Sequence, residues 1–369
     1  MKIGINLLNL SQDRFGGVEQ YITHLIGHMA DSRENLTLFL FLKRKLKNVF
    51  PQHEKIKIIQ FRKLMDSADV YDAIKKCKLD LWFCPLHRSY LPSIPVPTVA
   101  TIHDVLHTEY PDFVPGGLEE NNRYYEQYTA SFDAVITVSD FSKGAIARQL
   151  SIPERKIHVI HLNAPAIFDQ APAKNTMKGV KQKYQLPETY AIYPSSYNPH
   201  KNHLNLLKAI LILREKYNTT IPLVLTGYAD KSNGVYQSVL KFIRERSLEK
   251  QVWVLGYVPP EEMPSLYWNS SFLVFPSLYE GFGIPLVEAF KTKTPIVCSN
   301  KGSIPEIADI AGLYFNPENP EEIALKMMEL LNPVTRKQLS EKSSLRSRHF
   351  SWKKTAEETL KVFRSVTRN

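Results

Sequence analysis

Short runs of apolar, mostly β-branched residues alternate along this chain with segments of helical periodicity, and this alternation limits the possible folds more than any other feature. The first series of predicted strands covers 2–8, 36–43, 55–61, 79–84, 98–103, 134–139 and 158–162. The second series covers 190–195, 222–227, 252–258, 272–277, 295–299 and 312–315. Predicted helices lie between them, for example at 17–29, 140–150, 204–216 and 235–246. Such alternation is typical of parallel sheets covered on both faces, so the sequence predicts two doubly wound α/β domains.

The length of the chain agrees with two domains, because 369 residues exceed what one ordinary hydrophobic core supports. We predict a first Rossmann-like domain at 1–165 and a second at 189–350. Residues 166–188, rich in proline, alanine and lysine, are the predicted linker, and 351–369 form a further predicted helix. Since open α/β sheets bind ligands at the carboxyl ends of their strands, two such domains predict a ligand-binding cleft between them.

Composition excludes several classes of protein. With 43% hydrophobic residues and charges of both signs, the chain is globular rather than disordered. Its three cysteines show no metal-binding or redox spacing, which is typical of a reducing cytoplasm. The amino terminus lacks the pattern of a signal peptide, and no apolar run near it is long enough to span a membrane. We therefore expect a cytoplasmic protein.

The net charge of +10 lies mainly after residue 170. Such an excess attracts nucleotides, phosphates or acidic lipids, although lysines on solvated helix faces would give the same total. One basic stretch, Lys43–Lys63, contains eight lysines and arginines and a single acidic residue. It predicts either peripheral contact with the anionic inner face of the plasma membrane or an ordinary basic edge. No aromatic-rich RNA-binding motif accompanies these charges, so we expect no nucleic-acid partner.

The segment PSLYEGFGIPLVEAF, residues 276–290, directly follows a predicted strand. Its Gly281 and Gly283 permit tight or left-handed turns, and a predicted helix at 284–292 comes next. A glycine-marked helix start offers N–H groups and the positive end of the helix dipole to phosphate oxygens. The sequence therefore predicts an anion site at this turn.

Two glutamates bracket this helix start, Glu280 before the turn and Glu288 in the first or second helical turn. A carboxylate that faces back toward the turn can accept hydrogen bonds from two adjacent hydroxyls, such as those of a ribose. Glu280 offers the same to another polyol. The alternatives are an interaction of Glu288 with the helix dipole and a solvated loop position for Glu280.

Four further residues stand at strand ends or helix starts. Gly16 and Gly17 precede an amphipathic helix, where they either allow close approach of a pyrophosphate or form a plain turn. His103 ends a predicted strand and is either a donor to a sugar hydroxyl or phosphate or a satisfied core histidine. Lys201, at a loop–helix junction, is either a point charge for a phosphate or an exposed lysine.

Established nucleotide and metal motifs are absent from the sequence. Leu286 stands where the dinucleotide fingerprint needs a third glycine, and no GxxxxGK[ST] occurs. No HExxH and no DxD pair of aspartates is present, so no catalytic metal is expected.

Together, the order and spacing of these positions resemble the retaining glycosyltransferases of family 4, which have the GT-B fold, over nearly the whole chain. In the first half the shared motifs are GGVEQY, TIHDV and VITVSDFSK. In the second half they are NPHKN, LTGYAD, VLGYVPPEEMPSLYWNSSFLVFPSLYEGFGIPLVEAF, TPIV, GSIPEIA and FSWKKTAEETL. The most specific is the E-x7-E pattern from Glu280 to Glu288. By this resemblance, the helix around Trp352 either crosses back onto the first domain or caps the second.

The resemblance assigns a role to each matching residue. It implies that Glu280 binds hydroxyls of the donor sugar and that Glu288 holds the ribose of the nucleotide. It implies that Lys201 holds the diphosphate and that His103 faces the donor sugar and the reaction centre. The other implied donor-binding residues are Gly16, Gly17, Gly281, Phe282, Gly283 and Ile284, the last two through their backbone.

The sequence departs from the family pattern in three places. Many relatives carry an arginine just before the lysine or five residues before it, where this chain has His200 and Ser196. Diphosphate binding is therefore expected to depend more on Lys201, or on another basic residue that the sequence does not identify. Lys293 replaces the glycine of the usual Cys-Gly-Thr-Pro run, which brings the tightness of that turn into question. The pair at 309–310 replaces Gly-Asp and is interpreted as a surface change.

The implied reaction is transfer of a hexose from a nucleoside diphosphate sugar to a glycan or lipid-linked saccharide, with retained anomeric configuration. No metal or other cofactor is expected, and surface polysaccharide biosynthesis is the expected process. GDP-mannose is the first expected donor and UDP-glucose the second. Two other hypotheses stay open: a non-catalytic regulator that binds sugar nucleotides, and a UDP-sugar epimerase or phosphorylase relative of the same fold.

Overall fold

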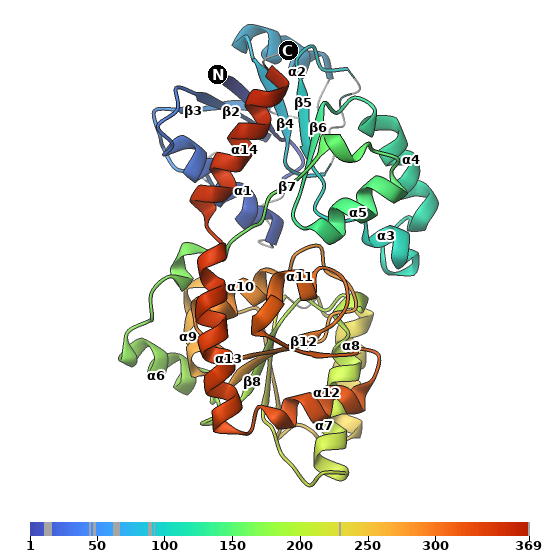
Figure 1. Ribbon diagram of the computed structural model, residues 1–369, viewed down its shortest axis with the longest axis vertical. Coiled ribbons are helices and arrows are strands. Elements are labelled where there is room, and N and C mark those ends of the chain that lie inside the picture. Colours follow the sequence, from blue (N-terminus) through green and yellow to red (C-terminus); the bar gives the residue numbers. More distant parts are fainter. Residues whose placement is uncertain are drawn as a thin grey trace. The chain divides into compact units, whose positions relative to one another are not determined.

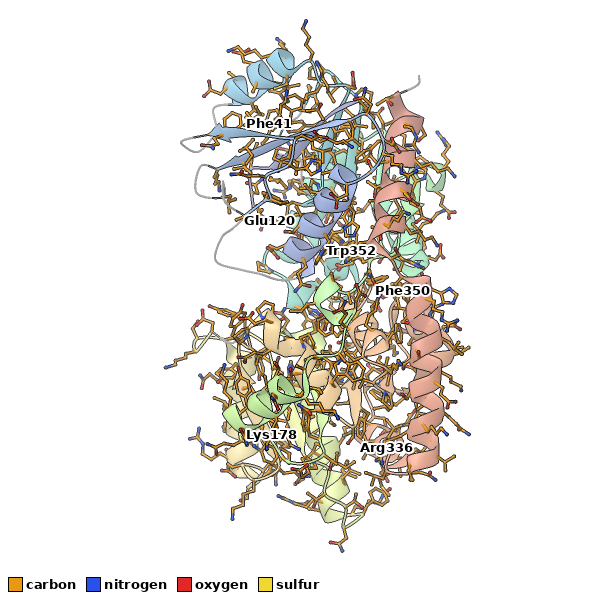
Figure 2. All side chains as sticks on the ribbon, turned by 90° about the vertical axis from the view of Figure 1, so that its left-hand side faces the viewer. Phe41, Glu120, Lys178, Arg336, Phe350 and Trp352 are labelled. Carbon is orange, nitrogen blue, oxygen red and sulfur yellow. The ribbon has the colours of Figure 1, made fainter. Side chains whose placement is uncertain are left out.

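The computed structural model describes residues 1–10, 17–43, 46, 49–61, 67–87, 91, 93–228 and 230–367. The chain forms two compact units (Figure 1). The first unit comprises 1–162 and 351–369, and the second comprises 163–350. Figure 2 marks Phe350 and Trp352, which stand on either side of the point where the chain passes from the second unit to the first.

The first unit is built on a seven-stranded parallel sheet with the order β3-β2-β1-β4-β5-β6-β7. Its strands are β1 (Lys2–Leu7), β2 (Thr37–Lys43), β3 (Ile56–Phe61), β4 (Leu81–Cys84), β5 (Thr98–Thr101), β6 (Ala134–Thr137) and β7 (Ile157–Val159). Ile3 of β1 pairs with Leu38 on one side and Leu81 on the other. The strand order thus reverses between β1 and β4, which is the kind of position where open α/β sheets bind ligands.

Helices pack on both faces of this sheet, because its strands carry apolar side chains on each side. The helices are α1 (Gly17–Ala30), α2 (Ser67–Cys77), α3 (Leu106–Glu109), α4 (Gly117–Thr129), α5 (Asp140–Gln149) and α14 (Trp352–Thr367). Neighbouring residues of β4 show the alternation. Trp82 joins the apolar cluster with residues of α2, α4 and α5, whereas the ring of Phe83 meets Phe363 of α14 at 4.9 Å.

The helix α14 belongs to the first unit, although it is the last helix of the chain. It packs along α1, where the ring of Trp352 stacks on His24 at 5.0 Å. The Thr355 hydroxyl donates to the carbonyl of His161 at 2.7 Å, and Arg364 pairs with Glu34. These contacts place the C-terminal helix on the first unit.

The second unit is built on a six-stranded parallel sheet with the order β10-β9-β8-β11-β12-β13. Its strands are β8 (Ala191–Pro194), β9 (Leu223–Thr226), β10 (Val252–Gly256), β11 (Phe272–Phe275), β12 (Ile296–Ser299) and β13 (Gly312–Phe315). Its helices are α6 (Lys174–Lys183), α7 (His203–Glu215), α8 (Gly234–Glu245), α9 (Met263–Asn269), α10 (Ile284–Lys291), α11 (Ile304–Ala308), α12 (Pro320–Glu329) and α13 (Pro333–Arg346). Helices α7, α8 and α12 pack together, as do α9, α10 and α13 (Figure 1).

Short 3-10 turns complete the two units. They are η2 (Pro111–Phe113), η3 (Glu154–Lys156), η4 (Ala166–Phe168), η5 (Pro199–Lys201), η6 (Pro260–Glu262), η7 (Asp309–Ala311) and η8 (Ser347–His349). Among the described residues, no helix combines the length and the apolar character that crossing a membrane requires.

The predicted fold class is confirmed, since both units are doubly wound α/β sheets. Each predicted strand is present, but most end earlier than predicted. The strand predicted at 98–103, for example, ends at Thr101, and His103 lies in the loop beyond it. The apolar pattern continues past the last hydrogen-bonded residue of each strand, because the loops that follow the strands are buried as well.

The segment 166–188, predicted as a linker, is part of the second unit in the structure. It contains α6, which packs against α9. Lys183 pairs with Glu262 at 2.7 Å, and the Tyr184 hydroxyl donates to the same carboxylate at 2.6 Å. Its proline and alanine content concealed a short amphipathic helix that buries Val180.

Candidate active site

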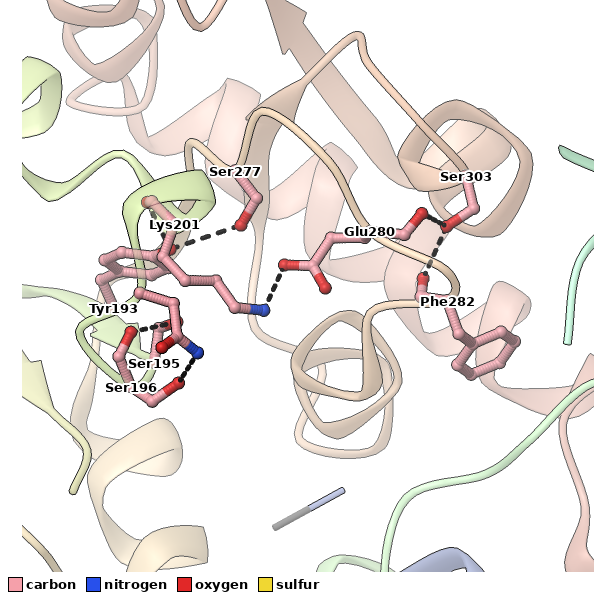
Figure 3. Close-up of polar contacts among 9 residues, drawn as sticks. Tyr193, Ser195, Ser196, Lys201, Ser277, Glu280, Phe282 and Ser303 are labelled. Carbon is pink, nitrogen blue, oxygen red and sulfur yellow. Dashed lines mark hydrogen bonds and ion pairs between the residues drawn. The ribbon is translucent and has the colours of Figure 1, made fainter. Parts of the chain in front are cut away.

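Three loops of the second unit meet at the carboxyl ends of neighbouring strands. The strand order reverses between β8 and β11, and such a reversal leaves a crevice in which open α/β sheets bind ligands. Lys201 follows β8, Glu280 follows β11, and Ser303 follows β12. Figure 3 shows Lys201 reaching Glu280 from one side while Ser303 holds its backbone from the other.

Lys201 and Glu280 form an ion pair, with the lysine Nζ 2.7 Å from Oε1 of the glutamate. Their side chains are only 17% and 11% exposed. The alternatives of an exposed lysine and a solvated glutamate are therefore wrong. A charge-assisted hydrogen bond between two largely buried groups fixes both of them. The second carboxylate oxygen of Glu280, Oε2, accepts no hydrogen bond from any described residue.

The backbone at Lys201 is held by two neighbouring side chains. The Tyr193 hydroxyl donates to the Lys201 carbonyl at 2.7 Å. Asn202 adopts a left-handed conformation with φ of 60°, which asparagine tolerates better than most residues. Its side-chain amide donates to the carbonyls of Pro276 at 3.0 Å and Pro317 at 2.7 Å. Asn202 thereby connects the loop after β8 to the loop after β11.

The backbone of Glu280 is held from the loop after β12. The Ser303 hydroxyl and N–H donate to the Glu280 carbonyl at 2.9 and 3.2 Å. The preceding residue, Gly302, has a φ of +62°, and a Cβ there would lie 3.0 Å from the Glu280 nitrogen. Only glycine fits this conformation and this close approach, so Gly302 and Ser303 together fix the position of Glu280.

The predicted turn and helix start at Gly281–Ile284 are present. Gly283 caps α10 with a φ of +94°, and a Cβ there would lie 3.2 Å from the Leu286 side chain. Since the first N–H groups of a helix have no partner within it, the N–H of Ile284 is available to an anion at the positive end of the dipole. The ring of Phe282 packs against Phe350 at 5.9 Å, so its predicted donor-binding role depends on its backbone.

Glu288 lies in the second turn of α10 and is 8% exposed. The Tyr267 hydroxyl donates to its Oε2 at 2.6 Å. Burial raises the pKa of Glu288 to about 7, whereas the hydrogen bond from Tyr267 acts in the opposite direction. The other oxygen, Oε1, accepts no hydrogen bond from any described residue. A helix dipole acts mainly within the first turn, so it does not account for a buried carboxyl at this position.

His103 lies in the first unit, in the loop after β5, and is 8% exposed. The centre of its ring lies 4.9 Å from that of Tyr21, in an edge-to-face contact, and 4.8 Å from that of His87. The ring has a hydrogen bond to the backbone of Pro85, but the buried Nε2 atom has no hydrogen-bond partner among the described residues, so His103 is only partly satisfied. Burial, and after it the charge of His87, hold the pKa of His103 well below its ordinary value. The imidazole is therefore neutral.

The structure brings together those predicted residues that belong to the second unit. They are Lys201, Glu280, Gly281, Phe282, Gly283, Ile284 and Glu288. Gly17 begins α1 of the first unit and is exposed, and Gly16 lies outside the described residues. The predicted contacts of Gly16, Gly17 and His103 with the donor, and the predicted cleft between the domains, stay predictions.

The basic stretch Lys43–Lys63 is described in part. Lys43, Lys55 and Lys57 lie within the described residues, and the other five basic residues lie outside them. The Lys55 ammonium donates to the carbonyls of Ser32 and Glu34. Its membrane contact stays a prediction. In the part of the chain that the structure describes, no group of three or more histidine, cysteine, aspartate or glutamate side chains could hold a metal ion.

Several supporting residues were not predicted from the sequence, among them Tyr267, Ser303 and Asn202. Tyr267 stands in a segment rich in aromatic residues and is indistinguishable by pattern from a core residue. Gly302-Ser303 carried a usable signal, since a glycine shortly after the predicted strand 295–299 marks a turn. Asn202 ends the NPHKN motif, but its role could not be predicted because its partners are backbone carbonyls far away in sequence.

Two Rossmann-like units, each built on a doubly wound parallel sheet, define the GT-B class of folds. Residues 178–368 match the family described as "Glycosyl transferases group 1", and residues 15–162 match "Glycosyltransferase Family 4". The chain therefore belongs to the group 1 glycosyl transferases, and it shares its first domain with family 4.

Two curated relatives are mannosyltransferases of Escherichia coli. "O-antigen chain mannosyltransferase B" is 33% identical over 284 residues, which cover 74% of this chain and 72% of that protein. "Serotype-specific mannosyltransferase WbdA" is 27% identical over 282 residues, which cover 73% of this chain but only 34% of that protein. Among solved structures, Anabaena HepE in complex with UDP-glucose has a TM-score of 0.79 at 18% identity, covering 99% of this chain and 100% of that one. At this identity the likeness shows the fold alone.

Proposed function

We propose that the protein is a retaining hexosyltransferase that moves a hexose from a nucleoside diphosphate sugar to a hydroxyl of a glycan or lipid-linked saccharide in surface polysaccharide biosynthesis. The cluster of Lys201, Glu280, the α10 start and Glu288 carries this proposal. It presents one cation, the available N–H of Ile284 and two carboxylates, each with an oxygen that accepts no bond from the described residues. A sugar nucleotide carries the matching groups, namely a diphosphate between two polyols.

Each group in the cluster has one proposed task. The oxygen Oε2 of Glu280 accepts hydrogen bonds from the donor sugar, and Oε1 of Glu288 accepts them from the ribose. Lys201 and the N–H of Ile284 hold the diphosphate. Lys201 then shares its ammonium between Glu280 and a phosphate oxygen, which its three N–H donors allow.

The proposed reaction proceeds on one face of the sugar. The bond between the anomeric carbon and the diphosphate oxygen breaks, and a bond from the acceptor oxygen forms on the same face. The proton of the acceptor hydroxyl passes to the departing diphosphate oxygen. Lys201 and the helix start stabilise the negative charge that develops on the leaving group, so the transfer proceeds without a metal.

Glu280 serves as a binding group and not as a covalent nucleophile in this scheme. Its carboxylate is already engaged by Lys201 at 2.7 Å, and an ion-paired carboxylate is a weaker nucleophile. A neutral His103, whose ring N–H is used by the backbone of Pro85, can accept one hydrogen bond from a sugar hydroxyl at Nε2 without adding charge. Retention is therefore assigned to the same-face route.

GDP-mannose is the proposed donor, because both curated relatives described above are named as mannosyltransferases. UDP-glucose is the second candidate, supported by the fold shared with HepE, which was solved with that ligand. The acceptor is proposed to be a growing polysaccharide or a lipid-linked saccharide.

The decisive experiment combines binding and turnover. A thermal-shift panel with GDP, UDP, ADP and dTDP identifies the nucleotide, because a ligand that binds the native state raises the unfolding temperature. Turnover of the matching sugar nucleotide with a lipid-linked acceptor, read by mass spectrometry and by the anomeric NMR signal, then gives sugar and stereochemistry. We expect retention and full activity in EDTA. The proposal fails if no nucleotide stabilises the protein and Glu288→Ala leaves donor turnover unchanged.

We also propose that Lys43–Lys63 brings the enzyme to the cytoplasmic membrane face, where a lipid-linked acceptor would lie. Each lysine or arginine near an anionic surface adds about 1 kcal/mol of attraction. Co-sedimentation with phosphatidylserine vesicles should therefore fall when Lys43 and Lys57 are replaced by glutamine, while neutral vesicles bind neither protein. Equal binding to both vesicle types would contradict the proposal.

A further inference from the structure

Glu288 is supported by a buried tyrosine that has no task in the transfer reaction. Tyr267 of α9 is fully buried, and its hydroxyl donates to Oε2 of Glu288 at 2.6 Å. Its ring meets the edge of Phe168 at 5.5 Å. The Tyr267 carbonyl accepts hydrogen bonds from the hydroxyls of Ser270 at 2.7 Å and Thr294 at 3.3 Å. Both the ring and the backbone of this tyrosine are thereby fixed.

The contact constrains the carboxyl in two ways. A phenol that donates to one oxygen favours the ionised form of the acid, because the ionised form is the better acceptor. It also fixes the rotation of the carboxyl, so that the ligand meets Oε1 and not Oε2. Without the hydroxyl, a carboxyl that is 8% exposed would face the cost of burying its charge alone.

Among the residues that the structure describes, no other ionisable group supports Glu288 in this way. On its own helix, Lys291 pairs with Asp169 at 2.8 Å. On α13, Arg346 donates to the carbonyls of Ile307 and Glu306 and pairs with Asp309. Burial raises the pKa of Glu288 to about 7, and Tyr267 is the one ionisable group in the described part of the chain that shifts it.

We infer that Tyr267 is a positioning residue of the donor site, whose hydroxyl favours the ionised form of Glu288 and presents Oε1 to the ribose. This inference depends on the proposed function, because it requires that Glu288 holds the ribose. The predicted consequence is a donor affinity that rises with pH across neutrality. A protonated carboxyl loses an acceptor, so it holds two adjacent hydroxyls less well.

The test compares Tyr267→Phe with the matched variant Tyr190→Phe. Tyr190 is also buried, and its hydroxyl donates at 2.7 Å to the carbonyl of Leu266, the residue before Tyr267. Both variants keep the ring and remove one buried hydroxyl. The Tyr267 hydroxyl also has a longer contact with the Pro285 carbonyl at 3.4 Å, but only Tyr267→Phe affects Glu288. Affinities for GDP and for UDP are measured by calorimetry between about pH 6 and pH 9.

The expected result is an upward shift of the affinity midpoint in Tyr267→Phe by at least about one pH unit, because a hydrogen bond to a charged group is worth that much. Affinity should then be roughly five-fold weaker than wild type at pH 7 and within a factor of about two at pH 9. Tyr190→Phe should keep the wild-type profile. Identical profiles for Tyr267→Phe and wild type would overturn the inference.

A second set of ligands separates the ribose from the phosphates, which themselves titrate near about pH 6. The 2′,3′-dideoxy forms of GDP and UDP keep the diphosphate but lack both hydroxyls. They should bind more weakly, and the difference between wild type and Tyr267→Phe should disappear. A difference that persists with the dideoxy ligands would overturn the inference.

Nucleotide binding by Glu288→Ala distinguishes a failure of the inference from a failure of the proposed function. If Glu288→Ala binds the nucleotides as wild type does, the ribose role of Glu288 fails, and the inference fails with it. If Glu288→Ala loses binding while Tyr267→Phe titrates as wild type, only the inference fails.

Carboxyl NMR of ¹³C-glutamate-labelled protein reads the titration midpoint of Glu288 without ligand, with Glu288→Gln to assign the signal. This midpoint should be higher in Tyr267→Phe, and an unchanged midpoint counts against the inference.

Discussion

The ammonium of Lys201 lies 2.7 Å from the carboxylate of Glu280, although 79 positions separate the two residues in the chain. The pair joins the loop after β8 to the loop after β11, where the strand order reverses. In the proposed function these residues bind different parts of one donor, the diphosphate and the sugar. Lys201 and Glu280 are therefore paired with each other before a donor binds. In the proposed function a bound donor interacts with both side chains while they stay paired.

Breaking this pair should destabilise the protein as well as abolish transfer. Lys201→Met leaves the Glu280 carboxylate, 11% exposed, without its partner, at a cost of about 1–3 kcal/mol. The double variant Lys201→Met/Glu280→Gln should recover part of that stability but none of the activity. Urea unfolding of the single and double variants measures the coupling. Strictly additive effects on stability would show that the pair contributes nothing.

The buried carboxyl of Glu288 should make stability depend on pH. Its pKa is about 7 in the folded protein and near 4.5 when unfolded, so the folded state binds more protons between these values. Stability attributable to Glu288 is therefore lost as pH rises from about 4.5 to 7, by roughly 3 kcal/mol. Guanidinium unfolding of wild type and Glu288→Gln at several pH values gives the difference between them. We expect the free energy of unfolding of Glu288→Gln to increase relative to that of wild type as pH rises. A difference in unfolding free energy that stays constant with pH would contradict this assignment.

Lys293, which stands where the family pattern has a glycine, should make the protein less stable than a glycine at this position would. Lys293 has a φ of 56° and follows α10 in a Schellman motif, in which Thr294 donates to the carbonyl of Ala289 at 2.8 Å. The left-handed conformation is unfavourable for a residue with a Cβ, so Lys293→Gly should stabilise by about 0.5–1 kcal/mol. The readout is the midpoint of urea unfolding at unchanged slope. Lys293→Ala removes the same charge but keeps the strain, so it should give no such gain.

The close approach at Gly302 should be intolerant of a methyl group. In Gly302→Ala the Cβ would lie 3.0 Å from the Glu280 nitrogen in a backbone with φ of +62°. We expect a loss of about 1–3 kcal/mol together with weaker donor binding, because the Glu280 loop must shift. Gly179→Ala is the control, since nothing lies within 4 Å of a Cβ there and alanine favours its helix. The assignment of Gly302 would be wrong if both variants bound nucleotide equally.

The sequence was sufficient to predict the sheets, because each strand is a short apolar run that ends at turn residues. Phe272–Phe275, for instance, is apolar on both faces and is followed by Pro276. It was also sufficient to predict the turn at Gly283, since a positive φ and a helix start have local signatures. The segment at 166–188 was predicted less well, because the stability of α6 depends on its packing against α9, which composition does not report.

The pairings within the site could not be predicted. Lys201 and Glu280 were each identified, but their ion pair depends on the order of β8 and β11 in the sheet. The raised pKa of Glu288 depends on burial, which a glutamate at a helix start does not suggest. Tyr267 was not identified, because an aromatic residue in a helix normally belongs to the core and only the position of its hydroxyl shows otherwise.

The helix α14 returns to the first unit after the whole second unit has been made. During synthesis the second unit, residues 163–350, can therefore fold as an uninterrupted stretch as soon as it leaves the ribosome. The first unit also needs the segment after residue 350, which packs Trp352 and Phe363 against it. A nascent chain can therefore complete its second unit before its first, and a variant cut after Phe350 should keep the second unit while its first unit lacks α14.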